Sequence, residues 1–217
     1  MKRIVVCIPL SWSYIPALFF HSWNKMHYYS HNKYELMLIS TSSCYMDTMR
    51  DDLVITARKH KPDYILWIDA DQLYPENTPE VLMKHIDSGK SVVGGLTPQN
   101  MQGGVNVYDF VHNDGIMQMQ NALPGQGLIK VDAMGMGGVM MKPEVFDELD
   151  LPCFTMRWNS KLARYPGEDV QFYVNCKKAG IDVWCDTDLV FGHIVTRAIV
   201  IEAGGGEKYL GEAKKKK

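Results

Sequence analysis

Two carboxylates separated by one residue follow a short apolar run at the end of the first third of the chain. The run is Tyr64–Ile68, and Asp69-Ala70-Asp71 comes directly after it. A short run with aromatic and β-branched residues predicts a strand buried on both faces. Because side chains alternate along an extended chain, we expect Asp69 and Asp71 to point the same way. The two charges repel unless a cation lies between them, and a hard divalent cation whose shell includes phosphate oxygens would fit.

The position of this pair also favours a role in ligand binding, because open α/β sheets bind ligands at the C-terminal ends of their strands. The pattern is nevertheless weak on its own. Asp is common in turns, so a pair of solvated carboxylates is the alternative interpretation.

Two further groups could act with this pair. Glu168-Asp169 follows Gly167 at the expected start of a helix. Acidic residues are favoured there by the helix dipole, but a carboxylate held at a helix start could also serve as a general base. His193 follows an expected strand, and imidazole beside carboxylates makes a mixed site suited to Mn²⁺. A single His is more often structural or exposed.

Arg50 and a glycine cluster complete the set of candidates. Arg50 lies in an expected helix, where it is either solvated or bound to a nucleotide or phosphate. The cluster Gly135-Met136-Gly137-Gly138 lacks the spacing of a dinucleotide-binding loop. It predicts instead that the backbone comes close to a ligand.

The first 95 residues alternate between strands and helices. We expect strands over 3–8, 34–39, 64–68 and 91–93, and helices over 15–29, 45–60 and 78–88. Such alternation predicts an α/β fold, with a mostly parallel, Rossmann-like sheet and helices on both faces. In helix 15–29 an aromatic stripe is expected to face the core: Phe19, Phe20, Trp23 and His27.

The second half is mixed and rich in loops. Polar residues 97–126 predict hairpins over a site, with strands near 105–111 and 117–119. Further strands are expected over 127–131, 137–141, 181–185 and 189–191, and helices over 143–149 and 170–179. The irregular stretch 154–165 is either an acceptor-contact surface or a self-packed loop; its candidate residues are Phe154, Arg157, Trp158, Lys161, Arg164 and Tyr165.

No repeat or linker divides the chain, so we expect one domain over 1–206. Its nucleotide-binding half would cover 1–96 and its acceptor and catalytic half 97–206, followed by a flexible, lysine-rich tail over 207–217. Of the 217 residues, 46% are hydrophobic and 22% charged, which is ordinary for a soluble protein. Without Lys214–Lys217 the chain has 19 basic and 25 acidic residues, which argues against a general nucleic-acid surface.

Location is predicted from cysteines and apolar runs. Five scattered cysteines without a C-x-x-C indicate reduced thiols and a cytoplasmic protein. No run reaches the ~18–20 apolar residues of a membrane span, so we expect no integral membrane segment. Pro9 and Pro16 interrupt the N-terminal apolar run, which argues against a signal peptide.

The order of these features is more specific than any one of them. The sequence resembles A-type (GT-A fold) glycosyltransferases, in particular family-2-like enzymes, and it is compact like some viral or phage-encoded members. The resemblance covers residues 3 to about 194. Its pieces are RIVVCIPLSW (3–12), ILWIDADQLYPENTPEVL (65–82), SVVGGLTPQ (91–99), GMGGVMMKPEVFDEL (135–149) and PGEDVQFYVNCKKAGIDVWCDTDLVFGHI (166–194).

The resemblance implies a metal-dependent transfer of a sugar from a UDP- or GDP-sugar to an acceptor hydroxyl. Asp69, Asp71 and His193 would form the site of Mn²⁺ or Mg²⁺, with Asp69 in contact with the ribose or a metal-bound water. In inverting members a carboxylate is the catalytic base, which implies Asp169, with Glu168 second. The residues implied to hold the nucleoside are Pro9, Leu10, Ser11, Thr41 and Arg50. The acceptor could be a glycan, a protein, a lipid-linked glycan or a modified nucleobase.

Two other classes remain open. A phosphatase or phosphotransferase of the haloacid-dehalogenase type also places D-x-D after a buried strand. In that family the motif lies on the first strand, whereas two expected strands precede it here, and Leu73 replaces the usual Thr or Val. The third class is a catalytically inactive sugar-nucleotide-binding protein with the same fold.

Overall fold

The computed structural model describes residues 1–11, 14–42, 45–99, 104–112, 116–160, 163, 167–195, 198–201 and 207–210. Three of the candidate acceptor residues, Lys161, Arg164 and Tyr165, lie outside this range, as does the end of the lysine-rich tail. All other candidate site residues are described.

A mixed sheet forms the centre of the molecule. Among the described residues it has seven strands, in the order β2 (Glu35–Thr41), β1 (Arg3–Pro9), β3 (Tyr64–Trp67), β10 (Val139–Met141), β5 (Val92–Leu96), β11 (Val183–Val190) and β8 (Leu128–Val131). Five of these strands run parallel, and β10 and β8 run antiparallel to their neighbours. The expected mostly parallel sheet is therefore confirmed.

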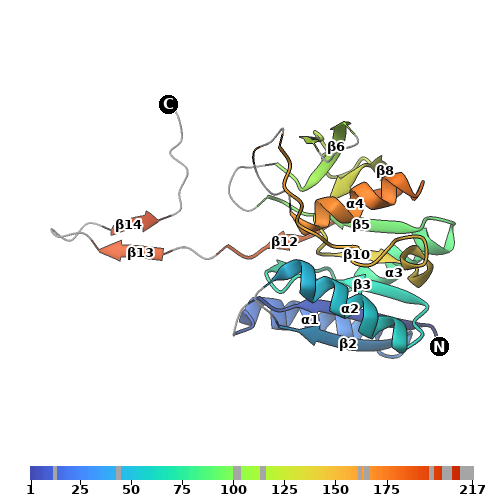
Figure 1. The fold of residues 1–217 in the computed structure, drawn as a ribbon. Coiled ribbons are helices and arrows are strands. Elements are labelled where there is room, and N and C mark those ends of the chain that lie inside the picture. The colour runs from blue at the N-terminus through green and yellow to red at the C-terminus, as the bar shows by residue number, and fades with distance from the viewer. Residues whose placement is uncertain are drawn as a thin grey trace.

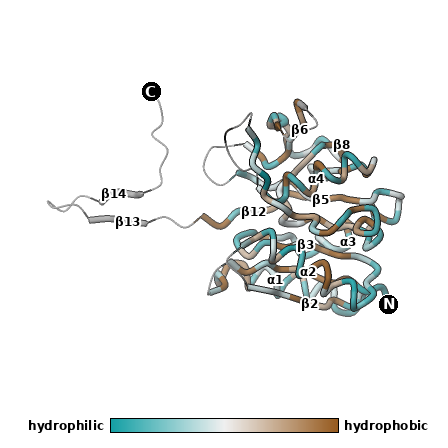
Figure 2. The backbone as a smooth tube through the Cα atoms, viewed as in Figure 1, coloured by the Kyte–Doolittle hydropathy of each residue, from teal (hydrophilic) through white to brown (hydrophobic). Residues whose placement is uncertain are grey.

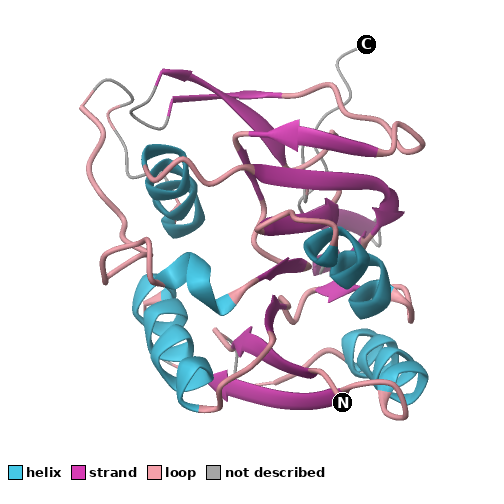
Figure 3. Cartoon of the chain, turned by 90° about the vertical axis from the view of Figure 1, so that its right-hand side faces the viewer, coloured by secondary structure: helices cyan, strands magenta, loops and turns pink. Residues whose placement is uncertain are grey.

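Helices cover both faces of this sheet (Figures 1 and 3). Helices α1 (Ala17–Ser30) and α3 (Thr78–Asp87) pack on one face. Helices α2 (Met46–Lys59) and α4 (Glu168–Lys178) pack on the other, together with the short 3₁₀ helix η1 (Pro143–Phe146). This arrangement is the α/β fold that the alternation of strands and helices predicted.

The buried strand β3 explains why the apolar run is continuous. All four of its residues are buried. Ile65 and Trp67 join the core on the α2 and α4 face, whereas Tyr64 and Leu66 join the core on the α1 and α3 face. A strand that meets helices on both sides has no face left for polar residues. Figure 2 shows the apolar stretches along the strands of this central sheet.

Smaller sheets flank the central one. Strand β4 (Gln72–Leu73) pairs with β12 (Gly192–His193), and β6 (Val107–His112) lies between β7 (Ile116–Met119) and β9 (Ala133–Met134). Strands β13 (Ala198–Ile201) and β14 (Glu207–Leu210) pair with each other. The described part of the expected tail, 207–210, is thus a strand.

The structure corrects the expected bounds of two strands. The two strands expected over 181–185 and 189–191 are one strand, β11, because Val190 rejoins Leu96 after a register shift that follows Asp186. Strand β3 ends at Trp67, so Asp69-Ala70-Asp71 forms a turn and not the end of a strand.

The aromatic stripe of α1 belongs to the core only in part: Phe19 lies in it and Trp23 packs against it. Only Phe19 is buried; Phe20 is 53% exposed, Trp23 is half-buried and His27 is exposed. The face of α1 that packs on the sheet consists of Phe19, Ser22, Met26 and Ser30. None of the helices within the described residues is both long enough and apolar enough to cross a membrane.

Candidate active site

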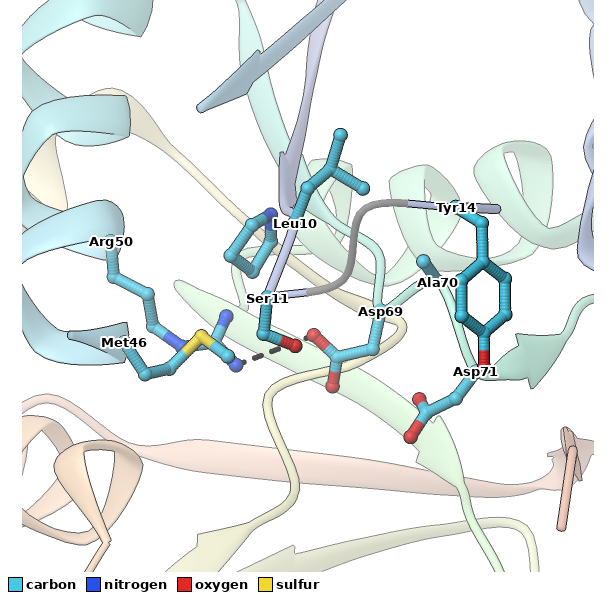
Figure 4. Close-up of a pocket in the computed structure, with 9 residues that line it drawn as sticks. Leu10, Ser11, Tyr14, Met46, Arg50, Asp69, Ala70 and Asp71 are labelled. Atoms are coloured by element: carbon cyan, nitrogen blue, oxygen red, sulfur yellow. Dashed lines mark hydrogen bonds and ion pairs between the residues drawn. The ribbon is translucent and has the colours of Figure 1, made fainter. Parts of the chain in front are cut away.

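A small pocket opens at the end of β3, where the turn 69–71 faces the loop after β1. Its volume is about 120 Å³. The lining residues come from three parts of the chain and are Pro9, Leu10, Ser11, Tyr14, Met46, Arg50, Asp69, Ala70 and Asp71 (Figure 4). Both carboxylates of the turn therefore face one pocket, as expected, although a turn and not strand alternation brings them there.

His193 lies against the second of these carboxylates. Its Nε2 atom is 3.4 Å from Oδ2 of Asp71, and its Nδ1 atom is 3.0 Å from the carbonyl oxygen of Pro98. Since a carbonyl can only accept, Nδ1 carries the proton and donates it to Pro98. Nε2 is the ring atom that faces the Asp71 carboxylate, and it can bind a cation when it carries no proton.

The short pairing of β4 with β12 places this imidazole. His193 is the direct partner of Gln72, and the backbone N–H of Ile194 donates to the carbonyl oxygen of Asp71 at 2.7 Å. Two backbone links thus fix His193 beside the turn that carries Asp71.

Two acceptors that face each other suit a shared cation. Two ligands about 2.1 Å from one cation are about 3.0–3.4 Å apart when the angle between them is about 90–110°. The separation of Nε2 and Oδ2 lies in that range. The Pro98 carbonyl is the kind of second partner that orients metal-bound imidazoles.

The residues that the structure describes would supply only part of a metal shell. No group of three His, Cys, Asp or Glu side chains that could hold a metal occurs in the described part of the chain. A cation bound by Asp71 and His193 therefore needs further oxygen ligands, and phosphates of a ligand in the adjoining pocket could provide them. The residues fit a divalent cation that binds together with a phosphorylated ligand.

Arg50 crosses from this turn to the start of α4. Its Nη2 atom is 3.3 Å from Oδ1 of Asp69, and its Nε donates to Oε1 of Glu168 at 2.9 Å. The Arg50 side chain is only 5% exposed, and the guanidinium lies near the rings of Trp67 and Phe154. Burial alone would lower the pKa of Arg50, but the two carboxylates outweigh it and raise the pKa above its ordinary value.

The candidate base lies next to this ion-pair network. The pKa of Asp169 is raised to about 7: burial is the largest cause, the negative charge of Glu168 adds to it, and Arg50 opposes both effects. Burial likewise raises the pKa of Asp69, again against the charge of Arg50. Oδ1 of Asp169 accepts the backbone N–H of Val170 at 2.8 Å. A carboxyl group with a pKa near 7 can both accept and release a proton at neutral pH.

The glycine cluster packs closely against protein side chains, and its approach to a ligand stays a prediction. A Cβ atom on Gly137 would lie 2.5 Å from Nε2 of Gln72 and 2.6 Å from Oδ2 of Asp69. Gly138 has a φ of +79°, and a Cβ there would collide with the ring of Phe191. The backbone of this loop therefore packs directly behind the Asp69 carboxylate.

The structure brings most of the candidate residues together. Asp69, Asp71, His193, Arg50, Glu168 and Asp169 form one electrostatic cluster beside the pocket. Pro9, Leu10 and Ser11 line the pocket, but Thr41 does not; its carbonyl oxygen instead accepts the backbone N–H of Leu10 at 2.9 Å.

Sequence reasoning missed several residues at the site. Tyr14 and Met46 line the pocket, and Tyr74 binds the turn through its hydroxyl, which lies 2.8 Å from the backbone nitrogen of Asp69. Gln72 is buried and lies 3.1 Å from the Tyr74 hydroxyl. The only sequence signal for Gln72 and Tyr74 is their position one and three residues after the D-x-D motif.

The expected acceptor surface is partly wrong. Phe154 is fully buried; its ring stacks on Phe172 at 4.9 Å and meets Trp67 edge-on at 5.4 Å. Its ring therefore packs near the Arg50 guanidinium inside the core, and it cannot contact an acceptor. Arg157 and Trp158 are exposed.

Comparison with solved structures defines the class of fold. The chain matches a crystal structure of A197 from STIV with a TM-score of 0.65 and 17% identity, over 98% of this chain and 95% of that chain. It matches GalNAc-T7 with UDP, GalNAc and Mn²⁺ with a TM-score of 0.57 and 16% identity, over 88% of this chain but only 43% of that longer chain. No protein-family model and no curated protein matches the sequence.

A third solved structure matches at a similarly low sequence identity. A mutant of Drosophila β1,4-galactosyltransferase 7, in complex with manganese, UDP-Gal and xylobiose, matches with a TM-score of 0.51 and 14% identity, over 90% of this chain and 72% of that chain. The fold is therefore that of A-type glycosyltransferases, as the resemblance implied.

Proposed function

We propose that this protein is a metal-dependent glycosyltransferase that moves a sugar from a nucleoside-diphosphate sugar to an acceptor hydroxyl. The contact between His193 and Asp71 is the observation that carries the proposal, because it places an imidazole nitrogen and a carboxylate oxygen, both common metal ligands, together beside a pocket. The fold supports it, since two of the matched structures contain UDP or UDP-Gal together with manganese.

The donor would occupy the pocket between the loop after β1 and the turn 69–71. Leu10 and Ser11 would contact the nucleoside, and Arg50 supplies a buried positive charge at the same pocket (Figure 4). Its Nη1 atom is buried without a hydrogen-bond partner among the described residues, so it has a donor to offer a ligand. Asp71 and His193 would hold Mn²⁺ or Mg²⁺ next to the diphosphate. When bound, the cation stabilises the negative charge that develops on the leaving diphosphate.

Asp169 would act as the general base. Its ionised carboxylate accepts the proton of the acceptor hydroxyl while that oxygen forms a bond to the anomeric carbon. The bond from the anomeric carbon to the diphosphate oxygen breaks, and its electron pair leaves with the nucleoside diphosphate. Attack from the side opposite the diphosphate inverts the anomeric configuration, which NMR of the product would reveal.

Glu168 has a different role in this scheme. Because its Oε1 is held 2.9 Å from Nε of Arg50, it is already engaged as an ion-pair partner. It would position α4 and keep negative charge beside Asp169. We also propose that residues 1–206 act as one catalytic unit, since Arg50 in the first half holds Glu168 in the second.

The other two functional classes have less support. The fold does not favour the phosphatase, and the D-x-D pair follows the third strand of the chain and not the first. A sugar-nucleotide-binding protein without activity would bind the donor but never release the nucleoside diphosphate.

Calorimetric titration with UDP and GDP, in the presence and absence of Mn²⁺, tests the metal and donor assignment. We expect saturable binding of one nucleotide that needs Mn²⁺ and is lost in Asp71→Asn. Nucleotide binding that is equal with and without Mn²⁺ would contradict it. Release of the nucleoside diphosphate from a panel of UDP- and GDP-sugars then separates an enzyme from a binding protein.

A further inference from the structure

Three uncharged polar side chains form a hydrogen-bonded cluster at the start of β6. Nε2 of Gln99 donates to the Tyr108 hydroxyl at 2.7 Å, and that hydroxyl donates to Oδ1 of Asn106 at 3.1 Å. Oε1 of Gln99 and Nδ2 of Asn106 have no hydrogen-bond partner within the described residues. All three residues are half-buried, so this group, which we call the amide cluster, has an amide oxygen and an amide nitrogen to offer a ligand.

The amide cluster adjoins the candidate metal site through Pro98. The carbonyl oxygen of Pro98, the residue before Gln99, is 3.0 Å from Nδ1 of His193. The backbone N–H of Asn106 donates to the carbonyl oxygen of Thr97 at 2.8 Å, which ties the two ends of the loop together. The cluster therefore stands on the same loop that orients the imidazole.

The amide cluster also lies near the start of α4. Asp169 and Tyr173 are four residues apart, so they share one face of this helix. On that face the Tyr173 hydroxyl is 4.0 Å from the sulfur of Met136, in the loop that follows β9. Strand β9 pairs with β6 at Tyr108. Burial raises the pKa of Tyr108, the hydrogen bond from Gln99 lowers it, and the charge of Asp169 raises it, so that carboxyl group lies within electrostatic range of the cluster.

The two neighbours of the amide cluster mark the two ends of the proposed reaction. The cation would bind the leaving diphosphate, and the base would take its proton from an acceptor on the other side of the anomeric carbon. The ring of the transferred sugar would therefore lie between His193 and Asp169, and the cluster adjoins both.

We propose that Gln99, Asn106 and Tyr108 form the subsite that holds the hydroxyl groups of the transferred sugar, and that this sugar is uncharged. The inference rests on the proposed function and names the class of its donor. Amide side chains suit neutral hydroxyl groups because each can both donate and accept a hydrogen bond. A hexuronic acid would instead bring a second carboxylate close to Asp169, and the cluster has no cation to pair with it. The Tyr108 hydroxyl is a positioning group, because it holds both amides.

Titration calorimetry of the full chain with Mn²⁺ tests this subsite without an acceptor. The probes are UDP, UDP-glucose, UDP-galactose and UDP-glucuronic acid, and the corresponding series GDP, GDP-mannose and GDP-mannuronic acid. We expect an uncharged sugar nucleotide to bind about tenfold or more tightly than the acidic one of its series. The double variant Gln99→Ala with Asn106→Ala should weaken binding of that sugar nucleotide about tenfold, and binding of the free nucleoside diphosphate less than about twofold.

Two further variants make the test specific. Gln118→Ala is the matched control: Gln118 is exposed and pairs with Asp109, the residue after Tyr108, so it lies on the opposite face of the small sheet. It should leave both affinities unchanged. Tyr108→Phe keeps the ring and is the second test variant should the double variant be unstable. It should also weaken binding of the sugar nucleotide more than binding of the free nucleotide.

Three results would overturn the subsite and leave metal-dependent nucleotide binding intact in the wild type. They are unchanged affinities in both test variants, equal losses for the sugar nucleotide and the free nucleotide, and tighter binding of the acidic sugar nucleotide than of the uncharged ones. Equal losses would mean that the amide cluster acts only by holding Pro98 against His193. A wild-type chain that binds no nucleotide in the presence of Mn²⁺ would overturn the proposed function, and this subsite with it.

Discussion

Nε2 of His193 lies 3.4 Å from Oδ2 of Asp71, although the two residues are 122 positions apart in the chain. Strands β4 and β12 create this contact by a pairing of only two residues each. The two side chains do not make a complete metal site with other described residues. A cation bound to them would need further ligands from a molecule in the adjoining pocket.

Removal of either partner should weaken cation-dependent nucleotide binding. We expect His193→Gln to weaken Mn²⁺-dependent UDP or GDP binding by roughly 10–100-fold or more, since the imidazole donates directly to the cation. Titration calorimetry measures the effect. His85→Gln is the matched control, because His85 also contacts an aspartate, Asp186 at 2.8 Å, but outside the pocket. Equal losses in both variants would contradict a specific role for His193.

Asp169→Asn should separate catalysis from binding. Turnover should fall by about 10²–10⁴-fold, the usual contribution of a general base, while donor binding is retained. Steady-state kinetics and calorimetry on the same preparation provide the two readouts. Full activity of this variant would exclude Asp169 as the base.

The same substitution should not destabilise the protein. An acidic group with a pKa raised to about 7 binds more protons folded than unfolded, so its contribution to the free energy of unfolding falls as pH rises from about 4 to 7. Asp169→Asn removes that loss, so its melting temperature at pH 8 should equal or exceed that of the wild type. A clear fall in melting temperature at pH 8 would show that the ionised carboxylate stabilises the fold.

The pH dependence of turnover should reflect the pKa of Asp169. Because the base must be ionised, kcat/KM should rise as pH increases through about 7 and level off above it. Glu168→Gln removes a negative neighbour that raises this pKa, so the rise should move to lower pH. Kinetics from pH 5 to 9 on both proteins would reveal the shift, and an unchanged profile would assign the titration to another group.

Arg50→Met should destabilise the fold. It leaves the carboxylates of Asp69 and Glu168 without their shared partner, and removal of one partner of a buried ion pair costs about 3–5 kcal/mol. The Asp69 and Glu168 side chains are 25% and 14% exposed, so we expect about 2–4 kcal/mol in urea denaturation. The double variant with Glu168→Gln should lose less than the sum of the two single changes. Additive losses would mean that the two residues act independently.

Gly137→Ala should disturb the candidate site more than Gly135→Ala. An added Cβ at Gly137 lies 2.5 Å from Gln72 and 2.6 Å from Asp69, whereas at Gly135 the nearest atom, on Asn106, is 3.4 Å away. We expect Gly137→Ala to weaken Mn²⁺-dependent nucleotide binding by roughly tenfold, through displacement of the Asp69 carboxylate. Equal binding by both variants would show that this contact does not hold Asp69 in place.

The alternation of strands and helices in the first half can be read from the sequence, because burial on two faces or on one leaves a local periodic pattern. The sequence also indicates that Asp69 and Asp71 follow a central strand, although the structure places them in a turn after it. The resemblance, and not any local pattern, pointed to His193 and Asp169 as their partners. The exposure of Phe20 on α1 escaped prediction, since periodicity does not tell how wide the buried face of a helix is.

Tertiary structure alone decided which distant groups meet. The antiparallel strand β10 lies between β3 and β5, and β12 pairs with β4 so that His193 reaches Asp71. Arg50 remains a candidate nucleotide ligand, and the structure shows that it also links Asp69 to Glu168. These contacts depend on the pairing of backbone edges far apart in the chain and on burial within the assembled core. The pKa of Asp169 is raised for the same reason: only the folded chain removes that carboxyl group from water and places Glu168 and Arg50 beside it.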